Sequence, residues 1–507
     1  MKKIINVEVK TRFVEPEKCK TDMLCVGVFS DVKQLDKTNG RLDKKLGGKI
    51  SRLIRLGDFK GEEESTAIVY TDSKIAAARL MLVGLGEKKK ATADTLRNAC
   101  ACAANKAVSL KVKNAAMAIH KALEEQLEPE VAGQVCAEGI YFGSYRYDEY
   151  ISKDKNGRTD SLQAEIIDSD SGRLQKINKG CKTGSIIGKE QSYARTLSNR
   201  PGNVINPPSL AAEAKKLAAK TTGLSCTVFE ERQLKAKKMG GILAVGSGSK
   251  SEPRFIVLKY NGAGKSSRKP AIALVGKAIT FDSGGISLKP AQNMEAMKLD
   301  KSGGIAVMAA MKAIAQLKLS VNVYGLIPSA ENLPSGTSFR PGDIVTTYSK
   351  KTVEIQNTDA EGRMILCDAL HYAYEQKCGI IVDIATLTGA CMVALGKYKA
   401  GLFGNDDKLI ENLEAAAEQS GEKVWRMPSG EEYAKEMKSK IADLKNIGSK
   451  WGGACTAAAF LGHFVGKAKW AHLDIAGMDI FENAQPNSAE GSSGFGVRLL
   501  TTFVKNL

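Results

Sequence analysis

The sequence predicts an α/β protein built from two unequal parts, and three observations support this. The chain has 507 residues, more than the roughly 250–300 residues at which a single hydrophobic core stops growing. Short β-rich runs alternate with helical patterns along most of its length, as in layered α/β folds. A segment without strand patterns divides the chain, so we expect domains at 1–170 and 201–507, joined by a linker helix at 171–200.

The first part alternates strand and helix patterns. Strand candidates stand at 67–70 and 80–84, followed by a helix from about Thr92 to Leu110. In that helix apolar residues recur at three- and four-residue spacing, which places one stripe against a sheet. A strand at 115–119 and a helix that ends near Tyr141 continue the pattern. The N-terminal part can therefore form one sheet that is covered by helices.

The second part begins after a Lys-rich, helix-compatible segment and the turn-forming string NRPGNVINPPSLA at 199–211. Helical patterns cover 304–317 and 363–376. β-branched and aromatic residues mark the strand candidates, which are 226–229, 254–258, 271–275, 321–327, 379–385 and 470–475. This part is also α/β, and it is the larger of the two.

The charge balance argues against a dedicated nucleic-acid module. Lys and Arg total 74 against 56 Asp and Glu, a formal net charge of +18, and the excess is spread evenly over both parts of the chain. A nucleic-acid module concentrates its charge on one face or in one tail. Nucleic acid is therefore an unlikely partner.

Cysteine usage and hydropathy indicate the cytoplasm. The eleven cysteines are scattered and form no Cys-x-x-Cys pair, so neither a disulfide framework nor a thiolate zinc site is expected. The N-terminal string MKKIINVEVKTRF lacks the apolar core of a signal peptide. The longest apolar stretch, 378–396, is interrupted by Asp383 and by Thr and Gly residues. We expect no membrane span.

Two simple schemes for catalysis do not fit the sequence. NGAGKSS at 261–267 resembles the end of a phosphate-binding loop, but Lys259 stands where the first Gly of that motif is needed. Only four histidines are present, without a His-Glu-x-x-His or Gly-x-Ser-x-Gly motif, so Ser or Cys nucleophiles lack their usual base. His472, inside the apolar string WAHLDIAG, is expected to be a core histidine with its polar atoms satisfied.

Two acidic segments are more informative. After the strand at 271–275, a glycine-rich excursion carries Lys277, Asp282, Lys289 and Asp300, where α/β proteins place ligand loops. The string NTDAEGR carries two carboxylates and an arginine two residues apart, which would share one face if the segment were extended. These are Asp359, Glu361 and Arg363.

Divalent metal would make such a cluster stable. Four carboxylates that converge in a partly dry site repel one another, and two divalent cations would balance their charge. Lys277 could then lose its proton and coordinate as a neutral amine, because burial and nearby cations both lower the pKa of a lysine. Taken alone, DSGG also fits an ordinary turn and DAEGR a solvated loop, so spacing leaves both interpretations open.

A family resemblance favours the metal site. The strings VGKAITFDSGGISLKP, NMEAMKLD, NTDAEGR, ATLTGA and WAHLDIAG, together with KMGGILAVGSGS at 238–249, resemble the leucine (cytosol) aminopeptidase family of two-metal exopeptidases. The resemblance covers residues from about 199 to 507, whereas the N-terminal third resembles the family only loosely. It implies a macro-like N-terminal domain with an oligomeric or regulatory role, and a catalytic domain with a mixed central sheet.

The resemblance also implies roles for single residues. Asp282 and Glu361 would bridge two metals, Zn²⁺ and/or Mn²⁺, that share a hydroxide nucleophile. Lys277 and Asp300 would complete the tighter site, and Asp359 the more exchangeable one. Lys289 and Arg363 match the two catalytic residues, with Lys289 as oxyanion donor and Arg363 as holder of a bicarbonate ion that moves protons. Lys301 stands where many relatives carry Met, and Ala278 where some carry Gly.

The substrate implied is a peptide with a free N-terminus whose first residue is Leu, Met or another amino acid. Its side-chain pocket would be apolar, and the expected substrate-binding residues are Lys289, Met297, Asp300, Thr386, Leu387, Gly389 and Ala476. The family further implies a homo-hexamer. An additional DNA-binding or regulatory role on the same scaffold is the alternative, because some bacterial relatives have one; the diffuse charge permits this role without supporting it.

Overall fold

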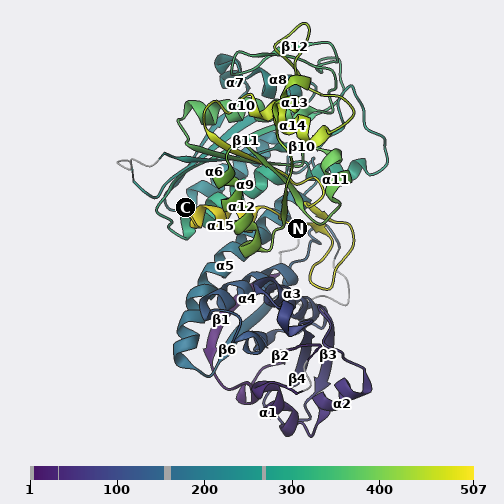
Figure 1. The fold of residues 1–507 in the computed structure, drawn as a ribbon, viewed down its shortest axis with the longest axis vertical. Coiled ribbons are helices and arrows are strands. Elements are labelled where there is room, and N and C mark those ends of the chain that lie inside the picture. The colour runs from purple at the N-terminus through teal and green to yellow at the C-terminus, as the bar shows by residue number, and fades with distance from the viewer. Residues whose placement is uncertain (1–4, 32–33, 153–160, 265–269) are drawn as a thin grey trace. The chain divides into compact units, whose positions relative to one another are not determined.

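The computed structural model describes residues 5–31, 34–152, 161–264 and 270–507. It separates into two compact units (Figure 1). Unit 1 comprises Met1–Ser192 and Phe481–Gly491, and unit 2 comprises Tyr193–Ile480 and Ser492–Leu507. The division falls inside one long helix, α5 (Ser171–Asn199), rather than on either side of a separate linker helix. The sequence-based boundaries at 170 and 200 therefore stay a proposal.

Unit 1 is built on a six-stranded sheet with the order β1-β6-β5-β2-β4-β3. All neighbouring strands are parallel except β3, which runs antiparallel to β4. The strands are β1 (Asn6–Phe13), β2 (Met23–Val28), β3 (Thr66–Tyr70), β4 (Arg79–Gly84), β5 (Asn114–Met117) and β6 (Ser161–Asp168). The strands expected at 67–70, 80–84 and 115–119 are present.

Helices cover both faces of this sheet. The paired helices α3 (Ala93–Ser109) and α4 (Pro129–Ser144) pack side by side on one core (Figure 1). The other core lies under the shorter helices α1 (Lys37–Lys45) and α2 (Lys49–Leu56). Helix α3 matches the helix expected over 92–110, because its apolar stripe packs on the sheet and Thr92 caps its N-terminus.

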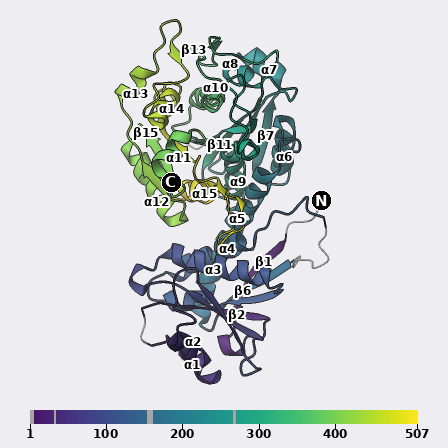
Figure 2. The same ribbon diagram turned by 90° about the vertical axis from the view of Figure 1, so that its right-hand side faces the viewer.

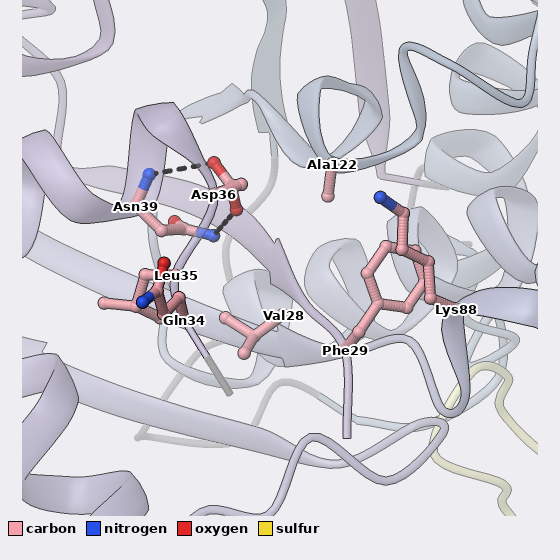
Figure 3. A pocket seen from close by; sticks show the side chains of 8 residues that line it. All are labelled: Val28, Phe29, Gln34, Leu35, Asp36, Asn39, Lys88 and Ala122. Carbon is pink, nitrogen blue, oxygen red and sulfur yellow. Dashed lines mark hydrogen bonds between the residues drawn. The ribbon is translucent and has the colours of Figure 1, made fainter. Parts of the chain in front are cut away.

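A small cavity of about 110 Å³ lies beyond the end of β2 in unit 1 (Figure 3). Asp36 on its wall caps α1, and its carboxylate accepts from the backbone and side-chain N–H groups of Asn39. The cavity contains none of the residues that the sequence analysis singled out. Its lining residues are Val28, Phe29, Gln34, Leu35, Asp36, Asn39, Lys88 and Ala122.

Unit 2 contains a nine-stranded mixed sheet with the order β16-β15-β18-β14-β9-β11-β8-β7, and β10 pairs with β11 beside this path. Two small sheets, β12-β13-β17 and β19-β20, stand apart from it. The strands are β7 (Leu224–Phe229), β8 (Arg254–Asn261), β9 (Ile272–Gly276), β10 (Ala278–Asp282), β11 (Asn322–Asn332), β12 (Ile344–Thr346), β13 (Thr352–Glu354), β14 (Ile380–Ala385), β15 (Ala400–Gly404), β16 (Val424–Arg426), β17 (Leu444–Lys445), β18 (Lys469–Asp474), β19 (Ile480–Phe481) and β20 (Gly491–Ser492). The mixed central sheet confirms the expected fold class.

Two hydrophobic cores lie on the two faces of the large sheet of unit 2. Helix α9 packs in one core and α10 in the other, on opposite sides of β11 (Figure 2). The helices are α6 (Pro207–Ala219), α7 (Glu231–Lys237), α8 (Gly240–Gly246), α9 (Ser302–Gln316), α10 (Glu361–Glu375), α11 (Gly389–Leu395), α12 (Asp407–Ser420), α13 (Glu431–Glu436), α14 (Gly453–Gly462) and α15 (Val497–Lys505). Because α9 is rich in Ala and apolar residues nearly all round, it is buried on almost every side.

The strand order places three loops at one edge of this sheet. Strand β14 runs parallel to β9 on one side and to β18 on the other, so the carboxyl ends of the three strands meet at the same edge. In open α/β sheets this edge is where ligands bind. Lys277, Thr386 and the loop after Asp474 follow these strand ends directly.

Two other expectations concern cysteines and membrane helices. All eleven cysteines are free, and ten of them are buried. Across the described ranges, no helix combines the length and the apolar composition needed to cross a membrane. The loop-like string at 261–267 lies partly outside the described residues.

Candidate active site

Lys277 marks the centre of the site at the carboxyl edge of the large sheet. It follows β9 directly and is 3% exposed. Its backbone N–H donates to Ile384 O (3.1 Å), and its Nζ donates to Thr386 O (2.9 Å). The ammonium also contacts Asp300 Oδ1 and Glu361 Oε1, each at 2.8 Å. One buried lysine thus joins three different segments.

The string DSGG forms a turn that only glycine allows. Asp282 ends β10, and its Oδ1 accepts from Gly284 N (2.9 Å). Gly284 and Gly285 have φ values of +85° and +68°, in the left-handed region that disfavours a side chain. A Cβ on Gly284 would stand 2.5 Å from Ser287 O. The two glycines therefore let the loop fold back over Asp282.

The acidic string NTDAEGR is not extended, which corrects the sequence-based expectation. Asp359 stands in a turn, where its backbone N–H donates to Asn357 Oδ1 (2.8 Å). Helix α10 begins two residues later, at Glu361. An Asn side chain that bonds two residues ahead starts a turn, and in the following helix residues two apart differ in direction by about 200°. Arg363 therefore does not share a face with Glu361; its Nη1 donates to Asn446 O at 2.7 Å.

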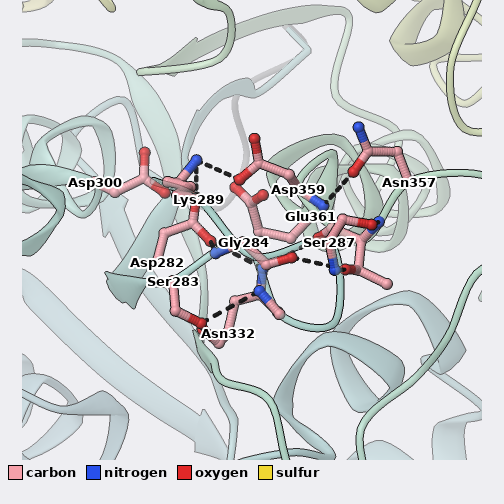
Figure 4. A network of polar contacts seen from close by, with 12 residues as sticks. Asp282, Ser283, Gly284, Ser287, Lys289, Asp300, Asn332, Asn357, Asp359 and Glu361 are labelled. Carbon is pink, nitrogen blue, oxygen red and sulfur yellow. Dashed lines mark hydrogen bonds and ion pairs between the residues drawn. The ribbon is translucent and has the colours of Figure 1, made fainter. Parts of the chain in front are cut away.

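The predicted carboxylates nevertheless converge (Figure 4). One oxygen from each of Asp282, Asp359 and Glu361 lies within 4.8 Å of the others. Asp300 is outside this group of three but joins it through Lys277. Lys289 Nζ lies 2.8 Å from Asp282 Oδ2 and also contacts Asp359. All five predicted metal ligands and Lys289 thus belong to one cluster.

The four carboxylates of the cluster outnumber its two lysines. Burial raises the pKa of the carboxyl groups of Asp282, Asp300 and Asp359, and neighbouring carboxylates raise each of them further. Asp300 Oδ2 and Glu361 Oε2 are buried and have no hydrogen-bond partner. Buried carboxylate oxygens without donors are costly and are the ligands that divalent cations take. The donor set therefore fits divalent metal.

The two lysines remain charged beside these carboxylates. Burial opposes the charge of Lys277, but Asp300 and Glu361 outweigh it and raise the pKa of the lysine. Burial likewise opposes the charge of Lys289, and Asp282 and Glu361 raise its pKa. The expectation of a neutral Lys277 thus depends on bound cations, because the carboxylates alone keep it protonated.

Arg363 is almost fully buried, with 7% of its surface exposed. Burial lowers the pKa of its guanidinium to about 10, so the group stays charged near neutral pH. One nitrogen is bonded to Asn446 O, whereas Nε has no hydrogen-bond partner. A buried cation with a spare donor can hold a small anion.

The predicted substrate-binding residues fall into two sets. Asp474 Oδ1 accepts from the N–H groups of Leu387 (3.1 Å) and Ala476 (3.3 Å), while Thr386 Oγ1 donates to Asp300 Oδ1 (2.6 Å). The first two hydrogen bonds hold Leu387 and Ala476 together through Asp474, and the third joins Thr386 to the metal cluster. They do not include Met297, half-buried in the 3₁₀ turn η4 (Met294–Leu299), or Gly389, exposed at the start of α11.

Sequence reasoning missed the residues that hold the ligands in place. Asn332 binds Asp282 and Thr358, Asn446 binds the segment around Asn357, and Asp474 binds the loop after β14. Asn332 and Asp474 each end a strand next to a ligand loop. This position at a strand end was the only feature of the sequence that could have indicated their role.

His472 is a core residue, as expected, with no exposed surface. Its Nδ1 is hydrogen-bonded to Asp383 Oδ1 at 2.5 Å, and Trp470 Nε1 donates to Asp383 Oδ2 at 2.7 Å. Its Nε2 has no hydrogen-bond partner, so the histidine is only half satisfied.

The comparisons with known proteins agree with this geometry. The model of the cytosol aminopeptidase family catalytic domain matches residues 192–501, and the model of that family's N-terminal domain matches residues 25–154. The chain belongs to the cytosol aminopeptidase family. It is therefore a metal-dependent aminopeptidase, a hydrolase of peptides.

Relatives of this family match almost the whole chain. A probable cytosol aminopeptidase of Geotalea uraniireducens (strain Rf4) is 44% identical over 467 residues, 92% of this chain and 93% of the relative. One from Aquifex aeolicus (strain VF5) is 42% identical over 501 residues, 98% of each chain.

Solved structures share the same fold. A tomato leucine aminopeptidase mutant, K354E, superposes with a TM-score of 0.86 at 34% identity, covering 99% of this chain and 97% of that one. The bottromycin maturation enzyme BotP in complex with Mn has a TM-score of 0.83 at 32% identity, covering 96% of this chain and 99% of that one.

Proposed function

We propose that this aminopeptidase releases N-terminal residues such as Leu and Met from peptides with two divalent metal ions, Zn²⁺ and/or Mn²⁺. The observation that carries the proposal is the convergence of Asp282, Asp359 and Glu361 within 4.8 Å. Asp282 and Glu361 would bind both ions. Lys277 and Asp300 would complete the tighter site, and Asp359 the exchangeable one.

When bound, such metals polarise the scissile carbonyl and make water nucleophilic near neutral pH. The remaining roles fall to side chains of the chain itself. Lys289 reaches Asp282 Oδ2 at 2.8 Å and would donate to the oxyanion that develops on the substrate carbonyl, an interaction that strengthens in the transition state. Its ammonium stays protonated, as a donor must.

Arg363 would hold a bicarbonate ion and would not act as the base itself, because a guanidinium remains protonated at neutral pH. Its buried charge and unpartnered Nε support this role. A bicarbonate ion held there would accept the proton of the attacking water and return it to the leaving amine.

Substrate selection follows from metal coordination and shape. A free α-amine could donate its lone pair to the metal held by Lys277 and Asp300, whereas an acylated nitrogen could not. Met297, Thr386, Leu387, Gly389 and Ala476 would line the side-chain pocket, and a Cβ built on Gly389 meets nothing within 4 Å. An apolar lining of this kind would suit a side chain such as Leu or Met.

We further propose that the enzyme is a cytoplasmic homo-hexamer, with the domain at 1–170 serving assembly or regulation. The printed names of the relatives, cytosol aminopeptidases, support the compartment. The absence of disulfides among its cysteines is consistent with reducing conditions.

The decisive experiment compares leucyl amide with N-acetyl-leucyl amide, with and without a chelator. We expect hydrolysis of the first substrate alone, loss of activity on chelation, and its return with Mn²⁺ or Zn²⁺. Full activity in protein that elemental analysis shows to be metal-free would refute the two-metal proposal. Asp282→Ala and Glu361→Ala should lower metal content most, because each residue would bind both ions.

A further inference from the structure

Asn332 ends β11 directly beside the first metal-binding segment. It is the register partner of Asp282 in the parallel pair β10–β11, and it is 1% exposed. Its backbone carbonyl accepts from Ser283 N (3.0 Å) and Ser283 Oγ (2.8 Å). Backbone and side chain of Asn332 therefore both contact the start of the glycine-rich loop.

The side-chain amide of Asn332 joins two segments that are far apart in sequence. Its Nδ2 donates to Asp282 Oδ1 (2.8 Å) and to Thr358 O (3.0 Å), the carbonyl just before Asp359. Both neighbours are acceptors, which fixes the orientation of the amide. The amide oxygen is buried without a hydrogen-bond partner. Its desolvation therefore costs free energy, and the two hydrogen bonds that the amide nitrogen donates offset this cost.

These contacts also orient the carboxylate of Asp282. Asp282 Oδ1 accepts from Asn332 Nδ2 and from Gly284 N, so Oδ2 is the oxygen that faces the cluster, where it contacts Lys289. The Thr358 side chain extends the connection: its Oγ1 donates to Gly284 O (2.6 Å) and accepts from Ser287 N (2.8 Å). Figure 4 shows this network below the carboxylates.

Among the described residues, the network reaches Asp282 and the segment of Asp359 but not Lys277 or Asp300. Lys277 and Asp300 are held instead by Thr386, through its carbonyl and its hydroxyl. In the described part of the chain, the Asn332 amide bonds to neither of them. Asn332 thus links Asp282, which we assign to both ions, with the segment of Asp359, which we assign to the exchangeable ion alone.

We propose that Asn332 is a positioning residue that sets the affinity of the exchangeable metal site. The inference rests on the proposed function for the identity of the two sites. Asn332 holds the two ligand segments at a fixed separation before an ion binds. Binding then loses less conformational entropy, as is general where hydrogen-bond partners orient metal ligands. The tighter site shares Asp282, but Thr386 also holds Lys277 and Asp300 there, so it should depend less on Asn332.

The test is Mn²⁺ binding to the full-length protein, followed by calorimetry and by elemental analysis after dialysis. Asn332→Asp keeps the size of the side chain but replaces its donor with a negative charge beside Asp282. We expect the dissociation constant of the weaker ion to rise about 10- to 100-fold, and that of the tighter ion to rise by a clearly smaller factor, because only the weaker ion also depends on Asp359. Excess Mn²⁺ should restore kcat without a change in KM for leucyl amide.

Asn322→Asp is the matched control. Asn322 begins the same strand, β11, and its Nδ2 donates to Gly264 O (3.1 Å) at the other end of the strand. This variant should keep both dissociation constants. If Asn332→Asp does not fold, as judged by circular dichroism, Asn332→Ala removes the same two hydrogen bonds without adding charge and carries the same expectation.

The outcomes separate the two proposals. Two unchanged binding constants in a folded Asn332 variant overturn the positioning role, as does a weakening of both ions by the same factor. A wild-type protein that binds no Mn²⁺ overturns the two-metal function itself. A larger rise in the dissociation constant of the weaker ion than in that of the tighter ion supports both the positioning role and the two-metal function.

Discussion

At the scale of single residues, Lys289 is the side chain whose role is easiest to isolate. It contacts Asp282 and Asp359 without belonging to the metal ligands. We predict that Lys289→Ala keeps both metals and loses about 10²- to 10³-fold in kcat, the usual effect of deleting one preorganised oxyanion donor. Steady-state kinetics with parallel metal analysis measures this. A raised KM with normal kcat would instead show that Lys289 only binds substrate.

Arg363 gives a second residue-scale prediction. Its guanidinium is buried and charged, with Nε free. Arg363→Ala should slow turnover more mildly than Lys289→Ala, because the loss of a held base leaves water and the metals in place. The initial rate of the wild type should rise with added bicarbonate, and that dependence should vanish in the variant. An identical bicarbonate response in both proteins would remove Arg363 from this role.

The residues that bear charge could be predicted from the sequence, whereas those that position them could not. Asp282 and Glu361 stand in short strings that alone also fit a turn or a loop, and the family resemblance decided between the two interpretations. Asn332 contacts Asp282 across 50 residues and Thr358 across 26, and nothing in the intervening sequence signals that the two segments meet. The position of an amide donor follows from strand register, which a single sequence does not specify.

At the scale of elements, long periodic segments were predictable and short irregular ones were not. The helices expected over 304–317 and 363–376 correspond to α9 and α10, because their apolar patterns extend over several turns. The three-residue strands β12 and β13 and the 3₁₀ turn η4 carry too few residues for a period. The extended interpretation of NTDAEGR was wrong because helix α10 begins at Glu361, two residues before the expected start.

The first turn of α10 gives an element-scale prediction. Gly362 is buried there, and a Cβ on it would stand 2.6 Å from Lys277 Cε and 2.7 Å from Lys277 Nζ. These atoms end a flexible side chain, so Gly362→Ala should displace the lysine rather than unfold the helix. We expect loss of the tighter metal and a fall in kcat/KM of at least about tenfold, since displaced ligands bind poorly.

The control for this variant is Gly40→Ala in α1, where the nearest atom to a new Cβ is 4.0 Å away. Replacing a helical Gly by Ala at an unstrained position should stabilise the protein slightly and leave metal content unchanged. Normal metal content in folded Gly362→Ala would show that Lys277 tolerates displacement, and would argue against its role as a ligand.

At the scale of the whole molecule, two α/β parts were predictable, but not how the chain divides between them. The segment Phe481–Gly491 belongs to unit 1 although it follows nearly all of unit 2. Asn487 Nδ2, for example, donates to Glu64 Oε1 at 3.0 Å. A contact over more than 400 residues leaves no local pattern, because composition and periodicity report only on neighbours in sequence. Domain boundaries that are predicted from composition therefore miss a late segment that packs with the first domain.

The net charge of +18 leaves one whole-molecule function to test, which is DNA binding. Any protein that neutralises phosphates releases counterions, so its affinity falls as salt rises. Specific base contacts keep binding measurable at physiological salt, whereas attraction by dispersed charge does not. Because the positive residues are spread along the chain, we predict no sequence preference and loss of binding by about 0.2 M salt. A gel-shift titration with a candidate duplex and its scrambled counterpart measures this. Preference for one duplex at that salt would contradict the prediction and would assign a DNA-binding role beside the peptidase activity.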